Sequence, residues 1–379
     1  MKRILIIDKT AGLEASHERH QAMAQMPGVE LHVLGPRDWV ENRRAVRWNP
    51  PEDTAYHVHP GKVCFKDYYA RHFYISGLIR AIRASQPQII QLLEEPWSLT
   101  AAQTLLAASL FAPQAKIIFY TWENIYRPWV YPSRLSPLYR QIDRAMHQRS
   151  TGAVCATEGA KAVLEQKGYN KPAVAIPYGI PQFFFEHGDP KNQATQTQPQ
   201  RQFTVGFIGR LMHMKGIDLL LQAARQIPDL HLIICGSGED EERLKQMAQE
   251  SKITQRVEWL PPRDEHQIPA LLQQMDVLVL PSRRVEGWQE QLGRVLIEAM
   301  AVGTPVIGAR SGAIPEVIGN AGLIFNENSS ADLIDKITIL KDNPAERDRL
   351  SAQGKLRAGE FFTWRRFAQQ ILIFYQSVN

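Results

Sequence analysis

The chain has 379 residues, of which 44% are hydrophobic and 22% charged, a composition that is typical of packed globular proteins and excludes global disorder. At roughly 100–200 residues per domain, this length suggests two domains. No apolar run approaches the ~18 residues of a membrane helix, and the run at 4–7 is too short for a signal peptide, so we expect a cytoplasmic protein. The net charge of +5 lies entirely in residues 1–190, which contain 22 basic and 17 acidic residues, because residues 191–379 contain 22 of each.

Residues 1–188 alternate short apolar runs with segments that are long enough for helices. A polar turn at 9–12 and a helical pattern at 14–26 follow the first apolar run. This alternation predicts a Rossmann-like domain with a parallel, doubly wound sheet. The predicted strands are RILIID (3–8), VELHVLG (29–35), PQIIQLLE (87–94), AKIIFYT (115–121) and GAVCAT (152–157).

The segment 189–202, DPKNQATQTQPQRQ, has no large apolar residue and predicts a polar linker. The alternation then restarts over 203–360, with helices predicted at 217–224 and 239–249. We therefore predict an α/β fold of two Rossmann-like domains that face each other across a cleft, with ligands at the carboxyl ends of the strands. The strands predicted in the second domain are FTVGFIGR, HLIICG, VEWL, DVLVLP and TPVIGA.

The last segment, 361–376, is amphipathic at helical spacing. We predict that it packs on a domain surface, with a membrane-surface helix as the alternative. The predicted apolar face consists of Phe361, Trp364, Phe367, Ile371 and Phe374.

The three cysteines, Cys64, Cys155 and Cys235, are widely separated, which predicts buried thiols and neither a disulfide nor a zinc site. The chain contains no Asp-x-Asp motif. We interpret the acidic run at 239–242 as a helix start, where negative charges suit the helix dipole. We therefore expect no metal site.

Arg210 and Lys215 lie in the turn after the predicted strand FTVGFIGR. Two cations this close can converge on one strongly anionic group such as a diphosphate. The alternative is a pair of solvated cations on a loop.

Two carboxylates, Glu290 and Glu298, follow the predicted strand DVLVLP. At ~1.5 Å rise per residue their eight positions span about 12 Å, comparable to the distance from the ribose of a sugar nucleotide to its hexose. Between them, the NH groups of Gly293, Arg294 and Val295 would sit at a helix start, which favours phosphate. The alternative for Glu298 is a polar residue on an exposed helix face.

Four motifs in order, GFIGRLMHMKG, LIICGSGEDEERL, MDVLVLPS and EQLGRVLIEAMAVGTPVIGARSGAIPEVIG, resemble the donor domain of the retaining glycosyltransferases of family 4, which have the GT-B fold. The resemblance covers about 204–319, whereas residues 1–188 are similar in outline only, with an IPYGI element at 176–180. It implies that 203–360 bind a nucleotide-sugar donor, that 1–188 bind the acceptor, and that 361–379 cross back to the first domain.

The resemblance also implies roles for single residues. Arg210 and Lys215 match the pair that binds the diphosphate and neutralises it as it leaves. Glu290 matches the residue that contacts the transferred sugar, and Glu298 matches the one that holds the ribose hydroxyls. The further donor-binding residues that we predict are Gly12, whose turn takes the place of a glycine-rich loop, and Gly209, Gly236, Leu292, Gly293, Arg294 and Val295.

Two positions depart from the family pattern. After AKIIFYT, where the family usually has a His that touches the donor sugar, this chain has Trp122-Glu123-Asn124. We hypothesise that Glu123 or Asn124 takes that place, and we include Glu123 among the catalytic candidates. Pro261-Pro262 stand where a Gly is common beside the nucleotide base, which leaves the base (UDP, GDP or ADP) and the sugar open.

The first domain mixes aromatic rings with cations at 65–74 and 122–131. Such segments suit stacking on sugar rings or contact with an anionic lipid surface, and the alternative is that half of the rings are core. Glu94-Glu95-Pro96-Trp97 is another candidate at the cleft edge. We therefore expect an anionic acceptor, or peripheral contact with the inner face of an anionic membrane. Nucleic-acid binding is disfavoured, because the positive charge is weak and the sequence has no motif known to recognise nucleic acids.

These features predict a retaining, metal-independent, hexosyl-type glycosyltransferase (EC 2.4) that needs no cofactor beyond its nucleotide-diphosphate sugar. Its acceptor would be a glycan, a lipid-linked or a small molecule in polysaccharide or glycolipid biosynthesis. The alternatives are a sugar-nucleotide epimerase or hydrolase of the same fold, and a non-catalytic sugar-nucleotide-binding partner. A dehydrogenase is disfavoured because no GxGxxG follows the first strand.

Overall fold

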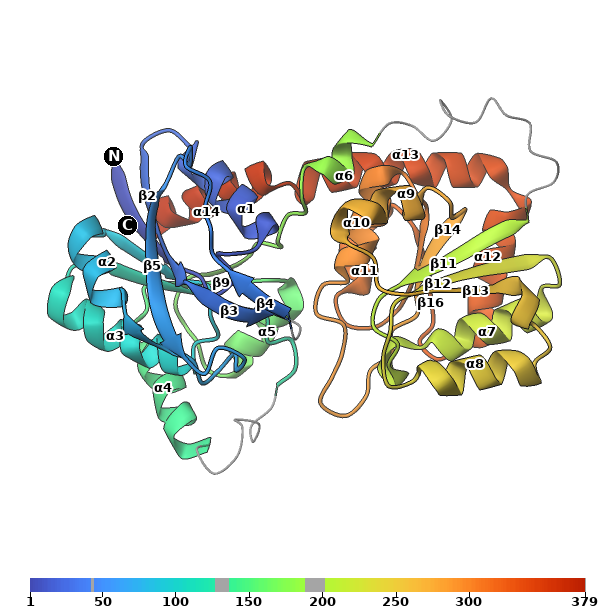
Figure 1. The fold of residues 1–379 in the computed structure, drawn as a ribbon, viewed down its shortest axis with the longest axis horizontal. Coiled ribbons are helices and arrows are strands. Elements are labelled where there is room, and N and C mark those ends of the chain that lie inside the picture. The colour runs from blue at the N-terminus through green and yellow to red at the C-terminus, as the bar shows by residue number, and fades with distance from the viewer. Residues whose placement is uncertain (42–43, 127–135, 188–201, 379) are drawn as a thin grey trace. The chain divides into compact units, whose positions relative to one another are not determined.

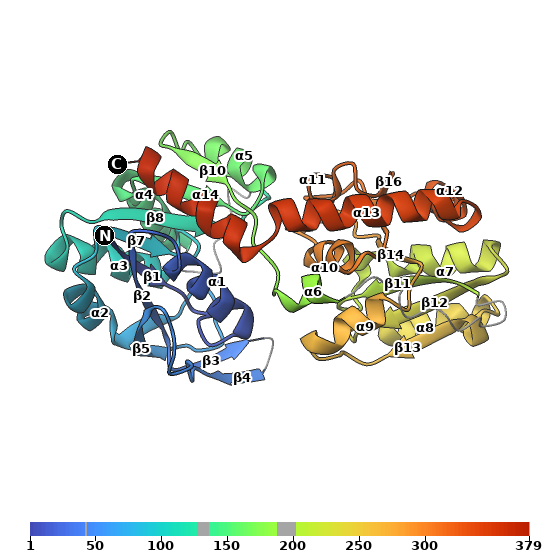
Figure 2. The ribbon, with the colours of Figure 1, turned by 90° about the horizontal axis from the view of Figure 1, so that it is seen from above.

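Figures 1 and 2 show the computed structural model of the chain, which describes residues 1–41, 44–126, 136–187 and 202–378. The chain divides into two compact units. Met1–Gly179 and Trp364–Asn379 form the first unit, and Ile180–Thr363 form the second. Each unit has its own sheet and its own core, so the predicted α/β class with two Rossmann-like domains is confirmed.

The first unit is built on a largely parallel sheet. Its strands are β1 (Lys2–Ile7), β2 (Val29–Pro36), β5 (His57–Cys64), β6 (Phe73–Ser76), β7 (Ile89–Leu92), β8 (Lys116–Thr121), β9 (Gly152–Cys155) and β10 (Ala173–Ala175). In the described residues their order is β10-β9-β8-β7-β1-β2-β5-β6, with β5 and β6 antiparallel and the other pairs parallel. A separate hairpin, β3 (Asp38–Glu41) and β4 (Arg44–Arg47), lies between β2 and β5 in the chain.

Helices cover both faces of this sheet, which is why its central strands read as continuous apolar runs. Leu5 and Ile7 of β1 pack in one core with α2, and Ile4 and Ile6 pack on the opposite face with α1 and the C-terminal helix. The helices of the first unit that precede the C-terminal one are α1 (Glu14–Ala24), α2 (Leu78–Ser85), α3 (Leu99–Phe111), α4 (Ser136–Arg149) and α5 (Glu158–Gln166).

The last helix, α14 (Trp364–Ser377), belongs to the first unit and packs beside α1 (Figure 2). Phe367 and Ile371 are buried in the same core as Ile4, as the amphipathic pattern predicts. The predicted face was wrong at one position: Phe361 is the last residue of the preceding helix and is 36% exposed.

The second unit is built on a wholly parallel sheet, as predicted. In the described residues its order is β13-β12-β11-β14-β15-β16, with strands β11 (Phe203–Ile208), β12 (Leu230–Cys235), β13 (Val257–Leu260), β14 (Val277–Leu280), β15 (Val306–Ala309) and β16 (Leu323–Phe325). Its helices are α6 (Phe183–Glu186), η3 (His213–Lys215), α7 (Ile217–Gln226), α8 (Glu241–Glu250), η4 (Thr254–Arg256), η5 (Glu265–Gln267), α9 (Ile268–Leu272), α10 (Arg294–Val302), α11 (Ile314–Ile318), α12 (Ser330–Asp342) and α13 (Pro344–Phe361).

The units divide at 179/180 and at 363/364, whereas the predicted domain limits were 188, 203 and 360. The earlier start of the second unit has a physical reason, because Ile180 and Phe184 are buried in its core. The predicted linker, 189–202, lies outside the described residues except for Gln202.

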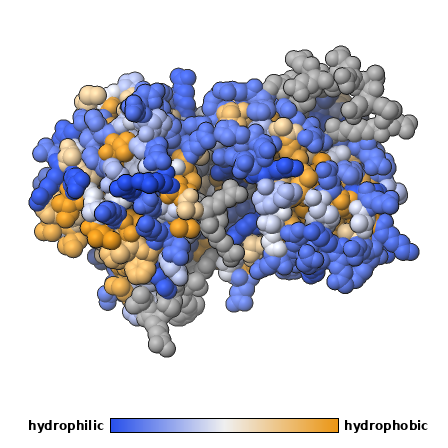
Figure 3. All heavy atoms as spheres, viewed as in Figure 1, coloured by the Kyte–Doolittle hydropathy of each residue, from blue (hydrophilic) through white to orange (hydrophobic). Residues whose placement is uncertain are grey.

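The face of the molecule in Figure 3 is mostly hydrophilic, and apolar side chains gather on the left of the view, over α2 and α3. Ile79, Leu106 and Leu110 are among the exposed large apolar residues there. In the part of the chain that the structure describes, no helix combines the length and the apolar character needed to cross a bilayer. All three cysteines are free, and Cys155 and Cys235 are buried as predicted.

Candidate functional site

The sheet of the second unit reverses its strand order between β11 and β14. The chain leaves these two neighbouring strands in opposite directions, toward β12 and toward β15. Such a place is called a switch point, and in parallel sheets ligands bind there, at the carboxyl ends of the strands. Arg210 and Lys215 follow β11, and Glu290 follows β14. The topology therefore gathers three of the four predicted catalytic residues at one edge of one sheet.

Lys215 and Glu290 are in contact there. The Lys215 Nζ lies 2.7 Å from Glu290 Oε2, and the Ser282 hydroxyl donates to the same oxygen at 2.7 Å. The side chains of Lys215 and Glu290 are only 16% and 10% exposed. The pair is thus held in a largely dry environment, where electrostatic interactions are stronger than in water.

The turn after Lys215 requires a glycine. Gly216 has φ +70°, and a Cβ at this position would lie 2.1 Å from the carbonyl oxygen of Pro281. The Lys215 ammonium also lies over the Trp288 ring, 4.9 Å from its centroid. Backbone geometry and a cation–π contact together fix this lysine. Arg210 is different: it is exposed, and its guanidinium has no hydrogen bond or ion pair with the residues that the structure describes.

Helix α10 begins at this edge, with Gly293 as its N-cap and Arg294 as its first residue. No side chain caps it, so its first N–H groups have no intrahelical partner and favour an anion. Arg294 Nε lies 2.6 Å from Glu298 Oε1, and its guanidinium also contacts Glu265. The predicted 12 Å between Glu290 and Glu298 assumed one helix and was wrong in that respect, because residues 290–293 precede α10.

The other predicted donor-binding residues lie around the same strand ends, with one exception. Leu292 and Val295 are half-buried against the core of the second unit. Gly209 and Gly236 follow β11 and β12, and a Cβ on Gly236, at φ +146°, would lie 1.9 Å from the Gly209 carbonyl oxygen. Gly12 is the exception, since it lies in the first unit, where a Cβ would meet Val46 of β4 at 3.0 Å.

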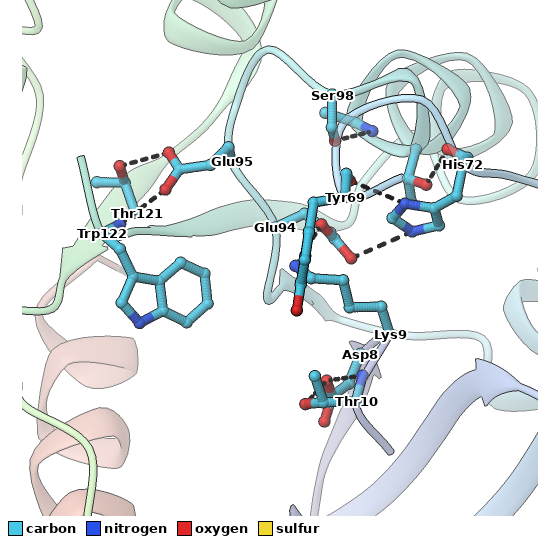
Figure 4. A network of polar contacts seen from close by, with 12 residues as sticks. Asp8, Lys9, Thr10, Tyr69, His72, Glu94, Glu95, Ser98, Thr121 and Trp122 are labelled. Carbon is cyan, nitrogen blue, oxygen red and sulfur yellow. Dashed lines mark hydrogen bonds and ion pairs between the residues drawn. The ribbon is translucent and has the colours of Figure 1, made fainter. Parts of the chain in front are cut away.

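The sheet of the first unit has its own switch point, between β1 and β7. Lys9 follows β1 and Glu94 follows β7, and the Lys9 Nζ lies 2.8 Å from Glu94 Oε2 (Figure 4). On the other side, His72 Nε2 lies 3.2 Å from Glu94 Oε1, while His72 Nδ1 contacts the Tyr69 carbonyl at 2.9 Å. Lys9 also lies over the Tyr69 ring at 5.2 Å. Glu94 is therefore clamped between two basic groups.

Next to Lys9, Asp8 forms a second buried network. Its carboxylate contacts Arg19 and lies 3.0 Å from His20 Nε2, and the Thr10 hydroxyl donates to it at 2.7 Å. Burial alone would raise the pKa of Asp8, but Arg19 and His20 outweigh burial and hold this pKa well below its usual range. Asp8 is thus a fixed negative charge at the end of β1.

A third network joins the ends of β7 and β8. Glu95 accepts hydrogen bonds from the Thr121 hydroxyl at 2.7 Å and from the Trp122 N–H at 2.9 Å. Burial raises the pKa of Glu95 to about 7, and the charge of nearby Glu123 acts in the same direction. Glu123, the fourth predicted catalytic residue, pairs with Lys167. A donor contact of Glu123 or Asn124 stays a prediction.

The sequence analysis missed several residues of these networks. Ser282, Trp288, Lys9, His72 and Lys167 were not singled out. The position of Lys9, directly after the first strand beside a switch point, is the signal that could have identified it. His72 and Lys167 reach their partners only through tertiary contacts, and no local pattern marks them.

Residues 188–357 match the family described as "Glycosyl transferases group 1". This stretch contains Arg210, Lys215, Glu290, Glu298 and the α10 N-terminus. The match covers less than half of the chain, and it makes these residues similar to the group 1 glycosyl transferases. The chain as a whole resembles solved GT-B structures. Sucrose-phosphate synthase from Thermosynechococcus elongatus is 18% identical, with a TM-score of 0.72 over 100% of this chain and 99% of its own. Anabaena HepE in complex with UDP is 16% identical, with a TM-score of 0.70 over 100% of both chains. The chain therefore has the GT-B fold.

Curated relatives match about half of this chain. The D-inositol 3-phosphate glycosyltransferase of Mycolicibacterium smegmatis is 31% identical over 185 residues, which are 47% of this chain and 41% of the relative. That of Corynebacterium jeikeium is 29% identical over 193 residues, 48% and 45% of the two chains. The matched region therefore covers less than half the length of each of these relatives.

The raised pKa of Glu95 predicts a pH-dependent stability effect. Its pKa of about 7 in the fold lies above the ordinary 4.5, so ionisation destabilises the folded state progressively between these values and fully above pH 7. A Glu95→Gln variant should unfold at nearly the wild-type temperature at pH 4.5 and at a higher temperature at pH 8, with a gain of up to about 3 kcal/mol. Glutamine preserves both contacts, because its oxygen accepts from Trp122 and its amide donates to Thr121.

The measurement is thermal unfolding of both proteins across pH 4.5–8, with Glu165→Gln, an exposed carboxylate on α5, as the matched control. A Glu95→Gln effect that does not change with pH would contradict the prediction.

Proposed function

We propose that the chain is a retaining glycosyltransferase that moves a hexose from a nucleotide-diphosphate sugar to an acceptor without a catalytic metal. The observation that carries the proposal is the contact of Lys215 with Glu290 at the switch point of a group 1 domain. It places a cation and a carboxylate beside an uncapped helix N-terminus, as a diphosphate next to a sugar requires.

In this proposal the donor lies along the carboxyl edge of the second sheet. Arg210, Lys215 and the first N–H groups of α10 bind the diphosphate, Glu290 contacts the hexose, and Glu298 holds the ribose. Three of these charges are paired within the chain, Lys215 with Glu290 and Glu298 with Arg294. The donor hydroxyls and phosphates would compete for these partners, so the pairs keep the site ordered before the donor binds. HepE was solved with UDP and with UDP-glucose, which makes UDP-sugars the first donors to test.

Catalysis follows from charge. As the bond from the anomeric carbon to the diphosphate breaks, negative charge collects on the leaving oxygen. Lys215 stabilises this charge from a fixed position, and the exposed Arg210 adds a second positive charge. The acceptor hydroxyl attacks from the face that the diphosphate leaves and gives its proton to the leaving oxygen, so the anomeric configuration is retained.

The acceptor is assigned to the first unit, where the positive charge is concentrated. That unit contains 24 basic and 15 acidic residues, a net charge of +9, whereas the second contains 20 and 24. A pocket of about 470 Å³ is lined by Arg37, Asp38, Arg47, Lys62, Val63, Lys66 and Ile75. Its lining has four positive side chains and one negative side chain, Asp38. We propose that this pocket receives an anionic group of the acceptor. The inositol phosphate in the names of the curated relatives supports such a group.

Loss of Lys215 should slow transfer. Lys215→Ala is expected to lower kcat about 10²–10³-fold, the size of losing one preorganised donor of charge. Because this change also leaves Glu290 without its cation, Arg210→Ala serves as a second variant, since the exposed Arg210 supports no contact in the described fold. Lys245→Ala, a surface lysine of α8 paired only with Glu241, is the control. Steady-state rates within twofold of wild type for both Lys215→Ala and Arg210→Ala would contradict the assignment.

Metal independence and retention are tested together. After thermal-shift screening of UDP-, GDP- and ADP-sugars has identified the donor, transfer should continue at an unchanged rate in EDTA, and NMR of the product should show the anomeric configuration of the donor. Loss of transfer in EDTA, or an inverted product, would overturn the respective part of the proposal. Release of free sugar at the same rate with and without acceptor would favour a hydrolase.

The acceptor pocket predicts a change in KM. Lys62→Ala with Arg47→Ala should raise the KM for a phosphorylated acceptor roughly tenfold, about 1.4 kcal/mol, and leave kcat and the donor KM unchanged. Lys161→Ala on α5 is the control for lost charge. An equal effect on an uncharged acceptor would contradict the assignment. Reduced sedimentation with anionic vesicles, with acceptor KM unchanged, would instead indicate that the pocket contacts a membrane.

A further inference from the structure

Three histidines and a glutamate gather on one face of two neighbouring strands in the first unit. β2 and β5 are parallel neighbours (Figure 1), and their register places His32 opposite His57. Residues two apart on a strand share a face, so Glu30 lies beside His32 and His59 lies beside His57. The group lies at the amino ends of these strands, whereas Lys9 and Glu94 follow the carboxyl ends of theirs.

The distances suit a metal ion. Ligand atoms of Glu30, His32 and His57 all lie within 4.8 Å of one another. Glu30 Oε1 and His32 Nε2 are 3.2 Å apart, close to the edge of about 3.4 Å in a tetrahedron with ligand distances of ~2.1 Å. The His57 ring stacks on His32 with 4.5 Å between the centroids and is exposed, so it has room to turn a ring nitrogen toward the ion.

His59 completes the arrangement. Its Nε2 lies 2.9 Å from His32 Nδ1, so one of these nitrogens donates and the other accepts. When His32 Nδ1–H is the donor, the lone pair of His32 Nε2 points toward Glu30. Histidines that bind metals are usually oriented in this way, by a hydrogen bond from their other ring nitrogen.

We propose that Glu30, His32 and His57 bind one Zn²⁺, with water as the fourth ligand and with His59 orienting His32. Two imidazoles, one carboxylate and an open position form a known set of zinc ligands. In the part of the chain that the structure describes, this is the one group of His, Cys, Asp and Glu side chains that converge closely enough. This proposal departs from the expectation of no metal site, which was based on the cysteines and the missing Asp-x-Asp motif, for one place in the first unit at the amino ends of β2 and β5.

The nearest competing cation is held away from the site. Arg3 of β1 pairs in register with Glu30, but its Nε donates to the Gln86 carbonyl at 2.9 Å, which leaves the Glu30 carboxylate to His32.

Bound zinc would connect β2 to β5 across residues 33–56. This segment contains the β3–β4 hairpin and Trp48, which packs against Gly35 and Gly12 beside the end of β1. A zinc ion that joins the two ends of this segment makes it a closed loop, which lowers the conformational entropy of the unfolded chain. Zinc should therefore stabilise the first unit without entering the reaction.

The experiment uses full-length, tag-free protein stripped of metal, since a histidine tag would bind zinc itself. Titration with ZnCl₂ should show one site by calorimetry and raise Tm by roughly 5 °C at saturation. His57→Ala, at an exposed position, should abolish this shift, and Glu30→Gln should weaken binding about 10–100-fold. His231→Ala is the control, because His231 and Glu258 also face each other on neighbouring strands, 3.9 Å apart, without a third ligand.

X-ray absorption at the zinc edge should show nitrogen and oxygen ligands alone. A zinc–sulfur distance near 2.3 Å would instead identify Cys64, on the same strand, and overturn the proposal. Undiminished binding in His57→Ala, or the absence of one-to-one uptake by the wild type, would overturn it as well.

Discussion

The parallel order of the two sheets is the constraint on which the candidate site depends. A parallel sheet directs all strand ends of one kind to one edge, and the reversal of strand order separates two loops and leaves space there. Lys215 and Glu290, 75 residues apart, meet at 2.7 Å because β11 and β14 are neighbours at this reversal. Lys9 and Glu94, 85 residues apart, meet at 2.8 Å beside β1 and β7 for the same reason.

Much of the fold was predictable because strands that are buried in the core appear in the sequence as short apolar runs. GAVC, VLVL and FTVGFI are apolar runs between turns, and the structure has strands at each of them. Six of the described strands were not predicted. β6, β10 and β16 are only three or four residues long. β3, β4 and β5 are polar: β5 reads HVHPGKVC and has two of its eight residues buried, and β3 and β4 each begin and end with a charged residue. Because β5 lies next to the edge strand β6, it needs less apolar surface, and its sequence resembles a loop.

The residues of the candidate site also fall into two groups, those that a local sequence pattern identifies and those that it does not. Arg210, Lys215, Glu290 and the start of α10 lie close to strand ends in the sequence, so local patterns identify them. Ser282 and Trp288 follow β14 closely too, but a serine and a tryptophan in a loop have many other uses. The partners His72, Lys167 and His57 depend on strand pairing and helix packing, which no window of sequence contains. The estimate of 12 Å assumed one continuous helix, and this assumption was wrong because α10 begins at Arg294, after Gly293.

The distribution of buried charge supports this placement of function. Replacing a buried ion pair by apolar side chains is often neutral or stabilising, so stability alone does not account for such pairs. In the first unit, Asp8, Lys9, Arg19 and Glu94 are all less than 9% exposed, and they lie at or beside the carboxyl ends of β1 and β7. Elsewhere in the same cores the buried residues are mostly apolar. These charges are concentrated where the topology leaves space, and several contacts hold each of them. We interpret them as a prearranged polar surface that binds a polar ligand.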